Sequence, residues 1–260
     1  RPRDDVMDKM MNKIKKLFCA FLFVPTLALA AGAHIKLDHA PINGEDRASL
    51  QSGARHFVNY CLNCHSAGYM RYNRLEDIGL NKQQILDNLV FTGAKVGDLM
   101  KIAMDPKEAK SWFGVAPPDL TVIARSRASE AGSGADWLYT YLRSFYRDAE
   151  RPSGWNNTVF ANVGMPHALW ELQGEQVLAE HKVQGEGYMK TEMVLKLDKP
   201  GKLSKIEYDY MVADLVNYMV YMAEPVRNDR KTIGMFVLIA LFLMFFLVYA
   251  LKKEYWKDVH

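Results

Sequence analysis

The chain has 260 residues, of which 49% are hydrophobic, which is enough for one folded domain with a buried core plus accessory segments. Its formal net charge is +3, and the basic excess lies in the flanks: residues 1–33 carry six Lys or Arg against three Asp or Glu, whereas residues 34–231 carry 24 against 25. A nucleic-acid-binding domain concentrates positive charge on its folded part, so this distribution argues against nucleic acid as a partner.

The first segment in chain order has the pattern of a secretory signal peptide. A lysine-rich stretch over 13–16 precedes an apolar run over 17–31, and the small-residue sequences that end at Ala30 and Ala33 fit cleavage sites. We therefore expect residues 1–33 to be removed on export, which leaves two of the three cysteines. The short leader favours a bacterial periplasmic protein, because a mitochondrial targeting segment would be rich in Arg and poor in acidic residues.

A predicted helix leads into the two remaining cysteines. Apolar residues recur from Leu50 to Cys61 with the spacing of one helix face. The sequence CLNCH follows, which places Cys61, Cys64 and His65 in a C-x-x-C-H motif. No β-strand is predicted nearby.

This motif has three physical interpretations. Zinc needs four ligands, and the sequence has neither a second cysteine pair nor two suitably spaced histidines. A thiol–disulfide exchanger would place C-x-x-C near a βαβ pattern and would leave His65 unexplained. The third interpretation is one covalently attached haem c, in which Cys61 and Cys64 form thioethers and His65 binds the iron from one side. Of the three interpretations, the motif favours haem c. The predicted export agrees, because c-type haem is attached outside the cytoplasm.

The second axial ligand decides between electron transfer and gas binding or catalysis. Met70, Met100 and Met104 are possible ligands, but Met165 differs because Gly164 and Pro166 flank it in a segment without helical periodicity. Such a loop can bring a sulfur to the far side of a haem.

His167 is the competing ligand, and it would give bis-histidine ligation. We interpret it instead as an exposed loop residue, which leaves Met165 as the favoured ligand.

The sequence before the C-terminal segment predicts a β-hairpin and a helix. Alternating apolar residues predict a small β-hairpin within 175–200. Met211, Leu215, Met219 and Met222 share one face of a helix that begins with a Ser204–Glu207 capping box and stops at Pro225; we interpret these methionines as packing residues.

A membrane anchor follows the last soluble helix. Residues 232–251 are twenty residues without charge or proline, about 30 Å of helix, and they predict a single transmembrane span. The lysines of the tail 252–260 indicate a cytoplasmic side for that tail, so the domain over 34–231 is expected in the periplasm.

Several motifs in this order resemble the cytochrome c1 family, the haem-carrying subunits of quinol–cytochrome c oxidoreductases (bc1 complexes). The similar stretches are CLNCHSAGYMRYNRL (61–75), APPDLTVIARSR (116–127), the predicted helix GADWLYTYLRSFY (134–146), GMP (164–166) and AEPVRNDRKTIG (223–234). The resemblance covers nearly all of the mature chain. The family often has Met-x-Pro-Pro at its ligand methionine, whereas Pro166 and His167 follow Met165 here.

The resemblance implies a fold and a set of roles. The fold is mainly α: a c-type cytochrome domain with a small inserted β-hairpin and one C-terminal transmembrane helix. His65 and Met165 would be the axial ligands, Pro117 would pack at the haem near His65, and Arg127 would pair with a haem propionate. Trp137, Tyr141, Leu142 and Phe145 would form the apolar face of the 134–146 helix.

The implied function is electron transfer. The chain would accept one electron from a Rieske iron–sulfur protein and pass it to a soluble cytochrome c, next to a cytochrome b that oxidises quinol, and it would not be an enzyme on its own. The alternatives are an anchored cytochrome c that feeds a terminal oxidase and a haem-based gas sensor. A dihaem peroxidase would need a second C-x-x-C-H motif.

Overall fold

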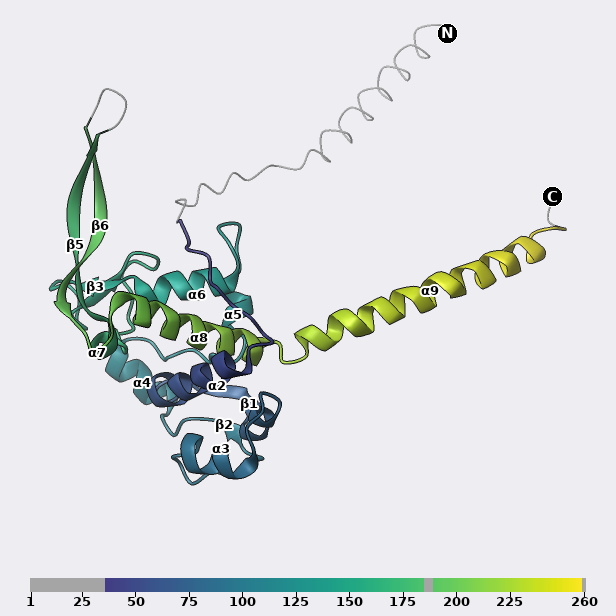
Figure 1. Ribbon diagram of the computed structural model, residues 1–260, viewed down its shortest axis with the longest axis horizontal. Helices are drawn as coiled ribbons and strands as arrows, with labels where there is room; N and C mark the ends of the chain where they lie inside the picture. Colours follow the sequence, from purple (N-terminus) through teal and green to yellow (C-terminus); the bar gives the residue numbers. More distant parts are fainter. Residues whose placement is uncertain (1–35, 185–188, 259–260) are drawn as a thin grey trace, which may run out of the picture. The chain divides into compact units, whose positions relative to one another are not determined.

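The computed structural model describes residues 36–184 and 189–258, so the predicted signal peptide at 1–33 lies outside the described residues. The described chain is mainly helical, with antiparallel strand pairs and one long apolar helix at its C-terminal end (Figure 1). The expected fold class is confirmed.

The helices, in chain order, are α2 (Arg47–His56), the π-helix η1 (Phe57–Cys61), the 3-10 helix η2 (Tyr72–Glu76), α3 (Lys82–Leu89), α4 (Pro106–Phe113), α5 (Ile123–Ser126), α6 (Gly134–Arg143), α7 (Trp170–Gln173), α8 (Lys205–Ala223) and α9 (Arg227–Tyr255). The strands are β1 (Ala67–Arg71), β2 (Leu99–Met100), β3 (Phe145–Arg147), β4 (Trp155–Asn157), β5 (Gly174–Gln184) and β6 (Met189–Pro200). They pair as β1–β2, β3–β4 and β5–β6.

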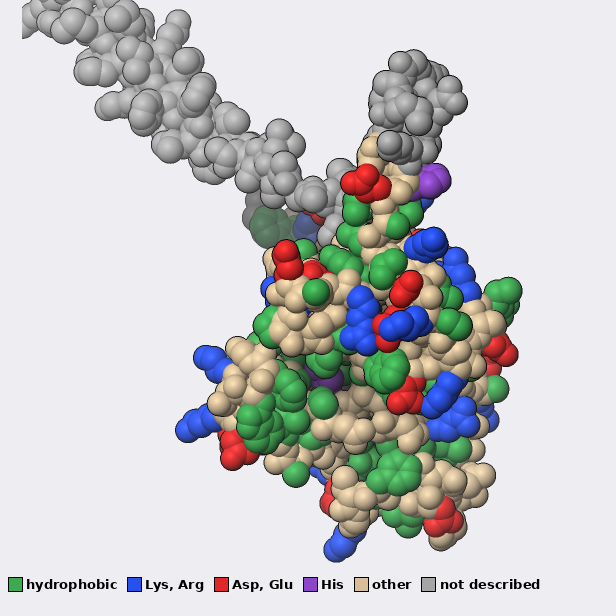
Figure 2. All heavy atoms as spheres, turned by 90° about the vertical axis from the view of Figure 1, so that its left-hand side faces the viewer, with side chains coloured by type: hydrophobic (Ala, Val, Ile, Leu, Met, Phe, Trp, Pro, Cys, Tyr) green, Lys and Arg blue, Asp and Glu red, His purple; other side chains and the backbone are tan. Residues whose placement is uncertain are grey.

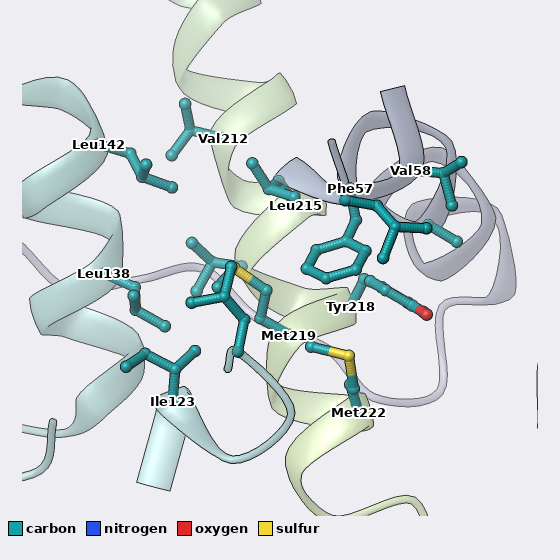
Figure 3. Close-up of a cluster of buried hydrophobic side chains, with 14 of the residues drawn as sticks. Phe57, Val58, Ile123, Leu138, Leu142, Val212, Leu215, Tyr218, Met219 and Met222 are labelled. Atoms are coloured by element: carbon teal, nitrogen blue, oxygen red, sulfur yellow. The ribbon is translucent and has the colours of Figure 1, made fainter. Parts of the chain in front are cut away.

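Helix α8 is the central element of the core. The predicted capping box starts it: the Ser204 hydroxyl accepts from the Glu207 amide, and the Glu207 carboxylate accepts from the Ser204 amide. The helix contacts α2, α5, α6 and α7, and the predicted methionine face is buried. Figure 3 shows its side chains between those of α5 and α6 on one side and those of η1 on the other. Each fully buried apolar side chain stabilises this core by about 1.5–3 kcal/mol.

Two glycines allow helices to approach closely. A Cβ at Gly53 in α2 would collide with the Asp214 carbonyl of α8 and would lie 2.7 Å from Tyr218 Cβ. A Cβ at Gly134, at the start of α6, would collide with the Ala124 carbonyl of α5. The absence of a side chain at these positions therefore sets the spacing between α2 and α8 and between α5 and α6.

Two local expectations are wrong. A strand does follow the cysteine motif, because β1 pairs with β2 through Ala67–Met100 and Arg71–Leu99. Phe145 does not belong to α6: the helix ends at Arg143, and Phe145 begins β3, opposite Asn157. Phe145 is nevertheless fully buried, because the strand returns its side chain to the same core.

The β5–β6 hairpin confirms the predicted hairpin and is longer than expected, with strands of 11 and 12 residues. Its base is fixed to the end of α6. The Gln176 side-chain amide donates to the carbonyls of Arg143 (3.0 Å) and Phe145 (2.9 Å). On the face shown in Figure 2, acidic and basic side chains are interspersed, in keeping with the near-neutral charge of residues 34–231.

Helix α9 contains the whole predicted span 232–251. Residues Asp229–Tyr255 form a helix with mean hydropathy 2.8 in its most apolar window, and none of that window is buried within the chain. A soluble protein would not expose this many large apolar side chains. The helix therefore fits a single membrane span.

Candidate functional site

The cysteine motif lies at the point where the first helix ends. Helix α2 runs into the π-turn of η1, which the Leu62 amide closes by donating to the Phe57 carbonyl. The amides of Cys64 and His65 then both donate to the Cys61 carbonyl, at 3.1 and 2.9 Å. This compact turn holds two half-buried, free thiols next to the imidazole.

The imidazole of His65 has a fixed orientation. Its Nδ1 lies 2.8 Å from the Pro118 carbonyl oxygen, which can only accept, so Nδ1 carries the hydrogen and Nε2 keeps its lone pair. Burial lowers the pKa of His65, against the opposing effects of Pro118 and Asp119. The ring is therefore neutral at neutral pH, which is the state and tautomer that a metal-binding histidine needs.

The proline-rich segment 116–121 runs beside this turn and holds it. The Gly68 amide donates to Asp119 Oδ2 (2.6 Å), and the Leu120 amide donates to the Ser66 carbonyl (2.9 Å). Pro117 is half-buried, directly before the proline whose carbonyl orients His65. The structure thus brings Pro117 and His65 into one small region.

The cysteine chemistry does not suit a redox thiol. Burial, followed by the neighbouring Cys64, raises the pKa of the Cys61 thiol to about 12. Disulfide oxidoreductases need the opposite shift, because the thiolate is their nucleophile. This environment favours the haem interpretation over thiol–disulfide exchange.

Met165 lies in the irregular segment between β4 and α7, as predicted. It is half-buried and packs against the same apolar core as Cys61. The hydroxyl of Tyr141, from α6, donates to its sulfur at 3.5 Å. The preceding Gly164 is so close to Val115 that a Cβ there would lie 3.2 Å from Val115 Cγ1. The methionine loop therefore lies against the segment that leads into the His65 contact.

His167 is not an exposed loop residue, contrary to the sequence-based interpretation. It is 2% exposed, stacks on Phe145 at 4.8 Å with an interplanar angle of 5°, and meets Trp155 edge-on at 5.0 Å. Burial is the main cause that lowers its pKa to about 4; a hydrogen bond with Gln173 opposes this shift and the charge of Arg147 adds to it, so the ring is neutral. Its Nε2 has no hydrogen-bond partner among the described residues. It therefore remains a chemically competent alternative to Met165.

The other candidate methionines lie elsewhere. Met70 and Met100 are buried in the β1–β2 pair, and the Tyr218 hydroxyl donates to the Met100 sulfur at 3.8 Å. Met104 is half-buried between β2 and α4. Met70 also lies close to the 116–121 segment, because Gly68 of the same strand bonds to Asp119, but its side chain is buried in the β1–β2 pair.

Arg127 has the environment of an anion-binding side chain. Its guanidinium lies over the rings of Trp137 (4.6 Å) and Phe160 (5.7 Å). Its Nε is buried and has no partner among the described residues. A buried donor without an acceptor is costly, about 1–3 kcal/mol and more for a charged group, so an external carboxylate is a suitable partner.

These residues fit a c-type haem. Two free thiols and an imidazole with a free Nε2 occupy one turn, a thioether lies in the adjoining core, and a buried guanidinium N–H is available for a carboxylate. Tyr141 was expected only as part of an apolar helix face. Its contact with the Met165 sulfur joins segments 24 residues apart, and no local sequence pattern indicates it.

Residues 38–259 match the model of the Cytochrome C1 family. The chain is 53% identical over 250 residues to the ammonia monooxygenase gamma subunit of Nitrosomonas europaea, covering 96% of this chain and all of that protein. It is 48% identical over 250 residues to cytochrome c1 of Allochromatium vinosum, covering 95% of this chain and all of that protein. It is 24% identical over 233 residues to cytochrome c1 of Rhodospirillum rubrum, covering 82% and 83%.

Proposed function

The chain belongs to the cytochrome c1 family, and from this premise we propose that it accepts one electron from a Rieske iron–sulfur protein and passes it to a cytochrome c. Family membership makes it a c-type cytochrome and an electron carrier. The proposal adds the donor, the acceptor and a place beside cytochrome b in a quinol–cytochrome c oxidoreductase. Quinol chemistry would then belong to cytochrome b, and this chain would only carry electrons.

We assign the haem-binding roles to six residues. Cys61 and Cys64 would hold a single haem through two thioether bonds, with His65 and Met165 as axial ligands. Pro117 would pack beside the haem near His65, and Arg127 would donate to a propionate. When bound, the haem supplies a one-electron couple between ferrous and ferric iron.

The protein's own contribution is to keep the ligands in place while the electron passes. The bond from His65 Nδ1 to the Pro118 carbonyl prevents the ring from rotating and strengthens Nε2 as a donor. The buried core against which Cys61 and Met165 pack would keep water away from that side of the site, which favours the less charged ferrous form. These contacts suit a carrier that changes its charge without changing its ligands.

The proposed location of the haem domain rests on helix α9 and on the predicted signal peptide. Helix α9 would cross the bacterial inner membrane once, with Lys252, Lys253 and Lys257 on the cytoplasmic side. The haem domain would then lie in the periplasm, where the predicted signal peptide would direct it. In the periplasm the haem domain could contact a soluble cytochrome c directly.

The observation that carries the proposal is the oriented His65 imidazole beside two free thiols in a chain of this family. The test is to tag the chain at its C-terminus, solubilise the membrane mildly and identify the proteins that copurify. We expect a cytochrome b, a Rieske protein and quinol-dependent reduction of cytochrome c. Copurification with a terminal oxidase, without cytochrome b, would contradict the proposal.

A second assignment needs its own control, because one relative is named as an ammonia monooxygenase subunit. If ammonia monooxygenase subunits copurified instead of cytochrome b, this chain would be assigned as an electron carrier for that enzyme. A haem sensor is distinguished spectroscopically, because an open sixth position would let the reduced wild-type protein bind carbon monoxide readily.

A further inference from the structure

Tyr141 makes a direct contact with the proposed sixth ligand. The residue lies in α6 and is 8% exposed, and its hydroxyl donates to Met165 Sδ at 3.5 Å. A thioether sulfur has two lone pairs. It can accept this hydrogen bond with one pair and bind a metal with the other.

The tyrosine ring is held on both sides. Trp137 stacks on it at 4.7 Å with an interplanar angle of 14°, and Phe145 meets it at 5.0 Å and 68°. The hydroxyl lies on the axis of the ring, so its position is fixed once the ring is fixed. The side chain therefore presents its donor at one defined point of the core.

A second connection joins the same residue to the methionine loop. The Asn157 side-chain amide donates to the Tyr141 carbonyl at 2.8 Å. The side-chain Oδ1 of Asn157 accepts from the backbone amides of Val159 (2.8 Å) and Phe160 (3.2 Å), where the loop begins. Asn157 is 1% exposed, so these bonds are shielded from water. Helix α6 thus fixes both the start of the loop and its sulfur.

We propose that Tyr141 is a positioning residue for the sixth ligand: its hydrogen bond holds the Met165 sulfur so that the second lone pair faces the iron. The inference rests on the proposed function, since it requires Met165 to be a ligand. The bond also withdraws electron density from the sulfur, which makes it a weaker donor. A weaker donor stabilises ferric iron less, so the bond favours the ferrous form. By holding the sulfur in place, the same bond opposes displacement of the methionine.

The test is the Tyr141→Phe variant of the full-length protein, which removes only the hydroxyl. We expect unchanged haem content and a retained far-red band of methionine-bound ferric haem. At a fixed external potential the ferrous-to-ferric ratio should fall about threefold, a decrease of about 28 mV at about 59 mV per tenfold. Imidazole should displace the methionine at a several-fold lower concentration.

Tyr139→Phe is the matched control, because Tyr139 lies on the same helix and is also 8% exposed, with its ring against Arg143 at 4.2 Å. An equal shift in both variants would overturn the inference, since it would show a general effect of losing a buried hydroxyl. Unchanged potential and imidazole binding in Tyr141→Phe, with the far-red band present in the wild type, would overturn it while leaving Met165 as ligand. Absence of that band from the wild type would overturn both assignments.

Discussion

At the scale of single residues, the sulfur of Met165 has the largest expected influence on the redox potential. We expect Met165→Leu to keep its haem, because Cys61 and Cys64 are untouched, and to open the sixth position to water or carbon monoxide. A soft, neutral thioether favours ferrous iron, so its loss should lower the potential by on the order of 0.1 V. Such a decrease disfavours electron uptake by about fiftyfold. Redox titration and the far-red band measure the effect.

Met100→Leu is the control for this change. Met100 also accepts a hydrogen bond from a buried tyrosine, Tyr218 at 3.8 Å, but in the β1–β2 region. Its substitution should leave the potential and the band unchanged. If the band instead survives Met165→Leu, another methionine is the ligand. If the wild type lacks the band, the buried, neutral His167 would be tested next.

The charge of Arg127 gives a second prediction at this scale. Arg127→Gln removes the cation whose Nε has no partner in the described part of the chain, and it should leave the haem attached. The variant should have a potential lower by about 40 mV, because a nearby positive charge stabilises the reduced state by about 1 kcal/mol. Redox titration provides the measurement. Arg125→Gln, an exposed neighbour on α5, should show little change, and equal shifts in both would argue against a propionate contact.

At the scale of elements, the contact between α2 and α8 depends on Gly53. Alanine would gain up to about 1 kcal/mol of helix propensity, but its Cβ would collide with the Asp214 backbone carbonyl. Backbone cannot move aside as a flexible side chain can, so we expect a net loss of about 1–3 kcal/mol of stability. Chemical denaturation measures this loss.

Gly97→Ala is the matched substitution, because a Cβ at Gly97 would meet nothing within 4 Å. It should change stability by less than about 0.5 kcal/mol. If Gly53→Ala proved equally neutral, the close approach of α2 to α8 would not be a feature of the folded protein.

The elements that could be predicted from sequence have local causes. The capping box at Ser204 and the methionine spacing define α8, and the uncharged run defines the apolar part of α9. The end of α6 at Arg143 could not be predicted from a local sequence signal. Phe145 continues the apolar spacing of the helix, but the chain has already changed to a strand, and both geometries return its side chain to one core.

The same limit applies to the site. The C-x-x-C-H motif is local and could be found by spacing, and Gly164 and Pro166 indicated an irregular loop at Met165. The burial of His167 comes from Phe145 and Trp155, which lie in β3 and β4 and are distant in sequence. Such contacts depend on the assembled fold, so an isolated histidine after a proline gave no signal of them.

At the scale of the whole molecule, the binding elements and the anchor are separate in sequence. All six proposed haem-binding residues lie between 61 and 165, whereas α9 begins at Arg227 and none of its apolar window is buried against the described residues. The domain therefore does not need α9 to build its core. This separation predicts that the anchor can be removed without loss of the site.

We expect deletion of residues 232–260 to release a haem-containing domain into the periplasmic fraction, whereas the full-length chain should require detergent. Haem staining of the fractions after a high-salt wash measures the outcome.

A truncated chain that stayed in the membrane would indicate a second anchor, for which the apolar run over 17–31 is the candidate. N-terminal sequencing separates the two cases: a start between Ala31 and His34 means that the leader has been cleaved, so retention would then have to come from a partner subunit.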